Sequence, residues 1–242
     1  MTTPLSPTTR STPRREKERA QADRAALYDV LDSSLVCHLG VVVDGVPLAL
    51  PTVFGVDPDG PDEGGTLYVH GSVASRSLVQ GPAQDVSVTM TVLDGLVLAR
   101  SGFAHSMNYR SAVVIGRPRV VEESEEKAHA LDLLVDHVVP GRAAALRRPT
   151  RKELAATVVL ALPLLEASVK RRTGDPQDED QDLGTPVWCG VVPLSLVAGT
   201  PVTATDAAEA GASVVPGHVR DRADALRAGT AVTSATDEAG VS

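Results

Sequence analysis

Cysteine, aromatic residues and long apolar runs are all scarce in this chain of 242 residues. Its two cysteines, Cys37 and Cys189, each lie in an apolar run, which argues against a disulfide framework or a zinc site with paired spacing. No run approaches the ~18 consecutive apolar residues that cross a bilayer. The N-terminus has charged and proline-rich sequence where a signal peptide has an apolar core. We therefore expect a cytoplasmic protein.

Basic residues are also fewer than acidic residues in this chain. The formal net charge is -8 and the pI is near 5.2, which disfavours attachment to nucleic acid or to an anionic membrane. No Rossmann glycine fingerprint or P-loop occurs, and no nucleophile-elbow motif supports a hydrolase, although the residue types of a Ser-His-Asp triad are present. Chemistry on a small molecule is the better expectation.

The distribution of apolar residues predicts one main domain with two tails. Residues 1–13 are expected to form a disordered N-terminal arm, residues 14–195 the domain, and residues 196–242 a poorly ordered C-terminal extension. Within the domain, strands are predicted over 35–43, 46–56, 66–70, 86–93, 96–101, 111–121, 164–172 and 187–194, and helices over 16–31, 73–79, 122–139 and 150–161.

Hairpin turns set the expected topology. Asp44-Gly45 and Asp94-Gly95 each separate two β-rich runs, which is typical of a type I′ turn between antiparallel strands. The helix over 150–161 opens with Thr150 and Glu153, the spacing of a capping box. Several short strands joined by hairpins, with a few covering helices, favour a mainly β, antiparallel barrel.

The first polar cluster runs from His70 to Arg76, where a strand leads into a helix. Ser72 is expected to cap this helix, with Ser75 and Arg76 in its first turn. Backbone N–H groups, hydroxyls and a guanidinium together favour a bound phosphate. An ordinary capped surface helix with a solvated arginine is the alternative.

A second polar cluster contains Asn108, the only asparagine in the chain, and Arg110. It precedes the strand predicted to begin near residue 112, so we expect it at the rim of the barrel, where an amide can bind a heteroaromatic ring edge. A polar turn that satisfies its own backbone is the alternative. His105 either lines the site, binds a metal or haem iron, or faces water. Lys170 and Arg172 either add positive charge to the site or balance the acidic loop 175–182.

Four ordered segments resemble the pyridoxamine 5′-phosphate oxidase-like flavin-binding proteins. They are Leu35–Gly40, Leu50–Phe54, Leu67–Arg76 and His105–Ser111. Val138–Arg142 and Lys170–Gly174 resemble, more narrowly, the branch with the nitroimidazole-resistance proteins. The resemblance covers roughly residues 13–195 and implies an antiparallel split β-barrel, a homodimer, and FMN in a groove at the subunit interface.

By this resemblance the cofactor-binding residues are Thr52, His70, Ser72, Ser75, Arg76, Asn108, Arg110, Ser111, Lys170 and Arg172. Ser75 and Arg76 would hold the flavin phosphate, with His70 and Ser72 beside it. Thr52, Asn108, Arg110 and Ser111 would contact the ring or the ribityl chain. Ala104 stands where relatives often have a histidine, so the resemblance does not imply a role that needs a histidine pair.

The function implied is a flavin-dependent oxidoreductase with a nicotinamide as electron donor, in which the flavin performs the chemistry. No catalytic residue is assigned. The alternatives are a non-catalytic carrier of flavin or of haem, the latter bound through His105, His70 or His38, and a deazaflavin-dependent reductase. FAD in place of FMN also stays open.

Overall fold

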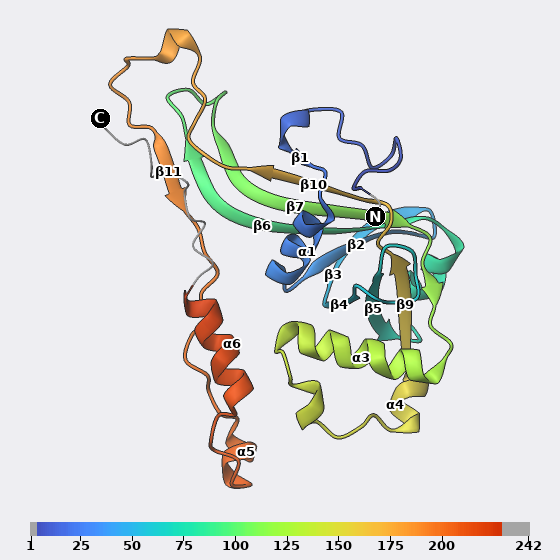
Figure 1. Cartoon of the computed structure of the whole chain (residues 1–242). Helices are drawn as coiled ribbons and strands as arrows, with labels where there is room; N and C mark the ends of the chain where they lie inside the picture. Colours follow the sequence, from blue (N-terminus) through green and yellow to red (C-terminus); the bar gives the residue numbers. More distant parts are fainter. Residues whose placement is uncertain (1–3, 229–242) are drawn as a thin grey trace. The chain divides into compact units, whose positions relative to one another are not determined.

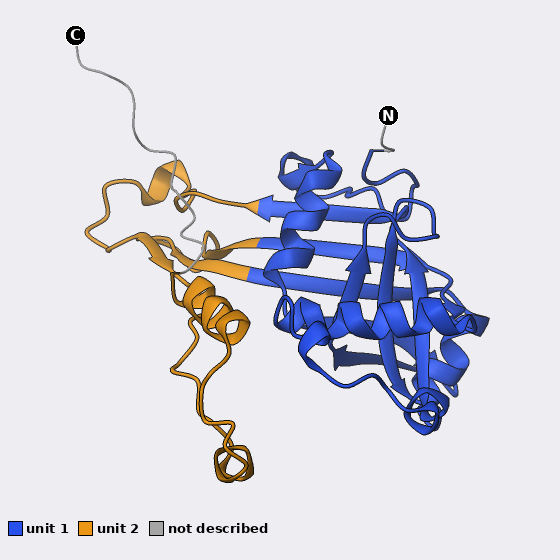
Figure 2. Ribbon diagram, turned by 60° about the horizontal axis from the view of Figure 1, so that its bottom comes forward, with its two compact units in different colours: residues 1–92, 110–171 blue, residues 93–109, 172–242 orange. Residues whose placement is uncertain are grey.

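The structure, a computed structural model, describes residues 4–228 (Figure 1). These belong to two compact units: residues 4–92 and 110–171 lie in unit 1, and residues 93–109 and 172–228 lie in unit 2 (Figure 2). The domain boundaries predicted at residues 13 and 195 stay predictions. No helix among the described residues is long and apolar enough to cross a membrane.

Two antiparallel sheets contain the strands of unit 1, and β6, β7 and β10 also include residues of unit 2. The first has the order β1-β10-β7-β6-β2-β3, with β1 at Ala20–Gln21, β2 at Cys37–Val43, β3 at Val46–Thr52, β6 at Val86–Leu98, β7 at Ser106–Gly116 and β10 at Ala167–Arg172. The second has the order β4-β5-β9-β8, with β4 at Phe54–Asp57, β5 at Thr66–Ser72, β8 at Arg119–Val120 and β9 at Thr157–Pro163. The predicted antiparallel split β-barrel with covering helices is confirmed.

Four α-helices accompany these sheets: α1 (Arg24–Ser33), α2 (Arg76–Gln80), α3 (Ser124–Val138) and α4 (Arg151–Ala156). Short 3-10 turns lie at Lys17–Arg19 (η1), Gly81–Ala83 (η2) and Ala143–Ala145 (η3). Unit 2 contains η4 (Asp180–Asp182), β11 (Gly190–Pro193), α5 (Thr205–Glu209) and α6 (Gly217–Ala228). In unit 2, β11 pairs with the last residues of β6.

The core of unit 1 explains why β5 is apolar on both faces. Leu67 and Val69 of β5 belong to the main core, which also contains alternate residues of β2 and the inner face of α1. Tyr68 points the other way, into a second cluster under α3 that includes Ala130 and Ala161. Because successive side chains alternate across a strand, a strand covered on both sides loses the polar alternation of a half-exposed one.

The predicted hairpin at Asp44-Gly45 is confirmed. Residues of β2 and β3 pair in register from Val43 and Val46 back to Cys37 and Thr52. Asp44 and Gly45 have φ values of 50° and 80°, the left-handed conformation that a type I′ turn requires at both central positions.

The hairpin predicted at Asp94-Gly95 is wrong. β6 runs without a break through both residues, and Gly95 faces Pro193 of β11. A Cβ atom on Gly95 would lie 3.0 Å from Cγ1 of Val191, so glycine serves close strand approach here instead of a turn.

Other predicted boundaries also shift. The helix predicted over 16–31 begins at Arg24, where the side chain of Asp23 accepts a hydrogen bond from the backbone N–H of Ala25. The capping box of Thr150 and Glu153 is confirmed, but α4 ends at Ala156 because the following β-branched residues pair with β5. The strand predicted over 111–121 divides at Pro118 into β7 and β8.

Candidate functional site

An apolar pocket of about 730 Å³ lies in unit 1, beside α3 and the segment that leads from α3 to α4. Its wall is made largely of aliphatic side chains from the residue after β3, from α3 and from the C-cap of α3, among them Val53, Leu131, Leu134, Val135, Val138 and Val139. The polar side chains that join them are His70, Arg142, Arg147, Glu153 and Thr157. The volume lies within the range of about 300–1,000 Å³ that is usual for small-molecule and cofactor sites.

His70 is a polar group with unused bonding capacity in this pocket. It is half-buried near the end of β5, and its Nδ1 atom is buried without a hydrogen-bond partner among residues 4–228. Burial lowers the pKa of His70, so the imidazole is neutral at physiological pH. A neutral imidazole can ligate a metal or exchange a hydrogen bond with a ligand.

The other histidines named from the sequence are placed differently. His38 lies exposed on β2, and His105 is exposed, with its Nδ1 donating to the carbonyl of Ser101 at 2.7 Å. Among His38, His70 and His105, only His70 lines the pocket.

Helix α3, which supplies much of the pocket wall, lies across β4, β5 and β9 (Figure 1). Gly55 of β4 permits this close approach, because a Cβ atom there would lie 2.9 Å from the backbone nitrogen of Leu134. A side chain at residue 55 would therefore push the helix, and the pocket wall with it, away from the sheet.

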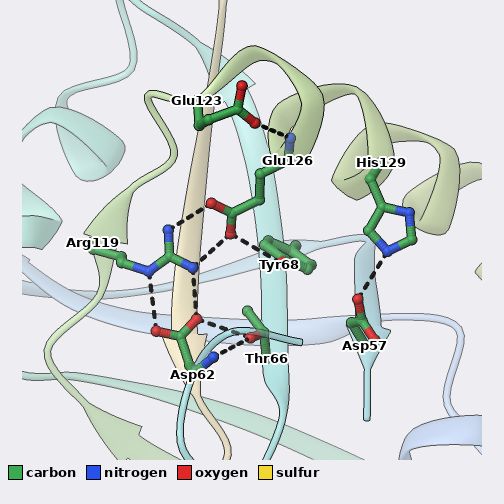
Figure 3. Close-up of polar contacts among 8 residues, drawn as sticks. All are labelled: Asp57, Asp62, Thr66, Tyr68, Arg119, Glu123, Glu126 and His129. Atoms are coloured by element: carbon green, nitrogen blue, oxygen red, sulfur yellow. Dashed lines mark hydrogen bonds and ion pairs between the residues drawn. The ribbon is translucent and has the colours of Figure 1, made fainter. Parts of the chain in front are cut away.

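A polar network also fixes α3 to the strands (Figure 3). The guanidinium of Arg119 donates to Asp62 at 3.0 and 2.8 Å and to Glu126 of α3 at 2.9 and 2.5 Å. Tyr68 donates its hydroxyl hydrogen to Glu126 at 3.0 Å, and burial, with the neighbouring carboxylate, raises the pKa of Tyr68 to about 12. His129 of α3 contacts Asp57 of β4 at 2.8 Å. The network positions the pocket wall without lining the pocket.

The predicted phosphate site around Arg76 is assembled differently from the expectation. Helix α2 has Ser75 at its N-cap, not Ser72, and spans only five residues. Ser72 instead accepts a hydrogen bond from the N–H of Ala74, and the hydroxyl of Ser75 meets that of Ser77 at 3.0 Å. Arg76 forms an ion pair with Asp44 at the β2–β3 turn. A phosphate bound here would compete with that carboxylate for the guanidinium.

The second predicted cluster lies in a strand. Residues 106–111 are the first half of β7, not a rim turn, and Asn108 and Arg110 occupy its inward-facing positions. In unit 2, the Asn108 amide donates to the carbonyl of Gly174 at 3.1 Å and accepts from Arg172 at 2.6 Å.

The remaining residues predicted to bind the cofactor lie in unit 1. Arg110 donates to Asp29 and to Ser33 of α1, each at 3.0 Å. Lys170 donates to the carbonyl of Arg15 at 2.7 Å. Thr52 ends β3 next to Val53 of the pocket wall, and Ser111 is half-buried in β7.

Sequence reasoning gave no cofactor-binding role to the two arginines of the pocket. Arg142 ends the segment Val138–Arg142 that resembles the nitroimidazole-resistance branch, and no predicted motif contains Arg147. The sequence offers one signal that could have drawn attention to Arg142: it directly follows a proline and a glycine, which mark the end of the predicted helix. A leucine and valine stripe on α3 reads equally well as core, so the sequence did not show that part of it lines a pocket.

Unit 2 has a hollow of its own, about 570 Å³, lined by Ser101, Phe103 and the segment 179–182. Glu179, Asp180 and Asp182 make it acidic. A phosphate or carboxylate would be repelled there, so an anionic cofactor fits the unit 1 pocket better.

Comparison with known proteins identifies relatives along most of the chain. Residues 23–171 match the family model described as pyridoxamine 5′-phosphate oxidase. The chain is 40% identical to the FAD and haem binding protein from Mycobacterium smegmatis, over 84% of this chain and 97% of that one, with a TM-score of 0.74. It is 35% identical to the flavocytochrome Anf3 from Azotobacter vinelandii, over 84% and 92% of the two chains, with a TM-score of 0.76.

A putative 5-nitroimidazole antibiotic resistance protein from Bacteroides thetaiotaomicron is 22% identical over 62% of this chain and 85% of that one, with a TM-score of 0.50, and shows the shared fold. No curated protein matches the chain.

Proposed function

The chain belongs to the pyridoxamine 5′-phosphate oxidase family, and on that premise we propose that it is a flavoprotein that also binds haem, with an oxidoreductase role. The proposal of haem binding rests on His70, a neutral, half-buried histidine whose ring has an unpaired nitrogen in an apolar pocket. The two relatives at 35% and 40% identity, one a flavocytochrome and one an FAD and haem binding protein, support both parts.

The residues of the pocket fit haem better than flavin. A porphyrin is planar and mostly apolar, and its iron takes a neutral imidazole as an axial ligand. The aliphatic wall from α3 and the imidazole of His70 match these needs. The edge of a flavin ring instead requires several amide or hydroxyl partners, which this wall does not offer.

We assign the flavin to the residues predicted from the sequence other than His70, which the haem takes, with the flavin phosphate at Ser75 and Arg76. Arg76 is exposed and paired with Asp44, so a phosphate would replace a surface carboxylate that interacts weakly in water. The roles of Thr52, Asn108 and Arg172 in contacting the flavin stay predictions. We propose FAD in place of the FMN that the family resemblance implies, because the relative from Mycobacterium smegmatis is an FAD and haem binding protein.

When bound, a flavin exchanges hydride or single electrons and haem iron exchanges single electrons. The protein's own part is to bind and orient the two groups and to exclude water from the apolar pocket. A nicotinamide as the electron donor belongs to this proposal, as does location in the cytoplasm.

The first test is the visible spectrum of the purified protein, before and after addition of FMN, FAD and haemin. We expect flavin bands with quenched fluorescence and a Soret band. His70→Ala should abolish the shifted Soret band and leave the flavin bands intact, while His38→Ala, a change at an exposed histidine, should alter neither. A Soret band that is unchanged in His70→Ala would refute the haem assignment.

Turnover separates an oxidoreductase from a carrier. Reduced nicotinamide, supplied with oxygen or a quinone, should be oxidised by the loaded protein at many equivalents per protein. Oxidation that stops at one equivalent would indicate a carrier.

A homodimer is also part of the proposal. The β2–β3 hairpin exposes the apolar side chains of Val42, Val46 and Leu48, of which Val46 is 55% exposed. An apolar strand pair left open to water is typical of an interface. Light scattering after gel filtration should give twice the chain mass of 25.2 kDa.

A further inference from the structure

The pocket has two guanidinium groups, and only one of them is neutralised. Arg147 donates to Glu153 at 2.9 and 2.6 Å, a bidentate pair. Arg147, with Thr150, lowers the pKa of Glu153 to about 2, so the carboxylate stays charged. The side chain of Arg142 has no hydrogen-bond or ion-pair partner within residues 4–228, although it is half-buried.

The backbone around Arg142 is held in place. Its N–H donates to the carbonyl of Val139 at 3.0 Å, at the end of α3. The next N–H, of Ala143, donates to the carboxylate of Asp136 at 2.7 Å. The arginine is thus fixed at the C-terminal end of the helix that forms the pocket wall.

A half-buried guanidinium without a partner has lost part of its hydration and gained nothing in return. A carboxylate supplies the missing partner in a bidentate geometry that matches the planar guanidinium. An apolar pocket with one such group at its lining suits a ligand that is apolar over most of its surface and carries a carboxylate.

We propose that Arg142 is the specificity-determining residue of the pocket and that it selects a carboxylate-bearing porphyrin by pairing with one of its propionate groups. This inference rests on the proposed haem function. Arg147 takes no part in the selection, because Glu153 already satisfies it.

The test compares haemin with haemin dimethyl ester, which has the same ring but no carboxylates. Affinities are measured by Soret titration for the wild type, Arg142→Gln and the control Arg148→Gln, whose arginine pairs with Asp132 and does not line the pocket. We expect the wild type and the control to bind haemin roughly 10- to 100-fold more tightly than the ester. Arg142→Gln should lose that preference while keeping the affinity of the wild type for the ester.

Binding of the ester by the variant shows that its pocket is still folded. If the wild type binds both porphyrins equally, or if Arg142→Gln keeps the preference, the assignment of Arg142 is overturned and the haem function stands. If neither porphyrin binds the wild type, the haem function fails, and the inference fails with it.

Discussion

Replacing Arg119 with methionine removes the cation that joins β8, α3 and the loop at Asp62, and retains most of the side-chain volume. The guanidinium makes four hydrogen bonds, two to Asp62 and two to Glu126. Without it, two carboxylates whose side chains are only 13% and 19% exposed keep their charge and lose their partner. Methionine cannot donate to either.

The magnitude follows from the burial of the three groups. Breaking a fully buried pair costs about 3–5 kcal/mol, and an exposed pair contributes about 0–1 kcal/mol. The side chain of Arg119 is 38% exposed, so water reaches part of the network and reduces the loss. We expect the free energy of unfolding to fall by about 2–3 kcal/mol, measured by urea denaturation followed by circular dichroism.

Arg147→Met is the matched control. Arg147 also makes a bidentate pair with a glutamate, but the two side chains are 70% and 48% exposed. We expect this change to cost less than about 1 kcal/mol. Equal losses in the two variants would refute the argument that burial decides the strength of the Arg119 network.

The Arg119 network should also depend on pH. Burial raises the pKa of Asp62, but the hydrogen bonds from Arg119 and Thr66 outweigh it, and the net pKa lies below its ordinary value. A carboxyl group with a lowered pKa stabilises the fold above its ordinary pKa, and this contribution is lost as the pH falls through the lowered value. The difference between the wild type and Arg119→Met should therefore narrow below about pH 4.

Three further predictions concern the helix, the flavin and the pocket histidine. Gly55→Ala should reduce the free energy of unfolding by about 1–3 kcal/mol, because its Cβ meets the backbone of α3, whereas Gly102→Ala, with open space around it, should be nearly neutral in the same denaturation assay. Arg76→Ala should weaken FAD or FMN binding by about 1.5–3 kcal/mol in a fluorescence titration; unchanged affinity would contradict the phosphate assignment. Because the pKa of His70 is lowered, the unfolded chain takes up the proton first, so stability should fall as the pH drops below about 6.5. His70→Gln should show a smaller loss between pH 7.5 and 5.5, and an identical loss in both proteins would contradict the burial argument.

Local turn and cap chemistry made some elements predictable from the sequence. Asp44-Gly45 gives a hairpin because both residues tolerate positive φ, and Thr150 with Glu153 starts a helix because each satisfies the other's backbone N–H. These interactions span only a few residues, so no distant contact is needed to specify them. The family and the fold class were also predicted correctly, from motifs in a consistent order.

The sequence alone did not determine where polar residues face. Asn108 and Arg110 read as a turn because polar residues in a row usually lie outside strands, yet both occupy inward positions of β7, where residues from other parts of the chain accept their hydrogen bonds. Asp94-Gly95 has the same turn chemistry as Asp44-Gly45, but it lies within β6, because β11 pairs with it there from nearly a hundred residues away.

Which residues line the pocket also depends on the tertiary structure. Its wall residues on α3 have the spacing of an ordinary core helix, and His70 and Arg142 lie 72 positions apart in the sequence. Turns and caps follow from interactions between near neighbours, so the sequence by itself determined them. An apolar wall, a neutral imidazole and an unpaired guanidinium come together only when α3 packs on the sheet, because burial and partner choice depend on residues far away along the chain.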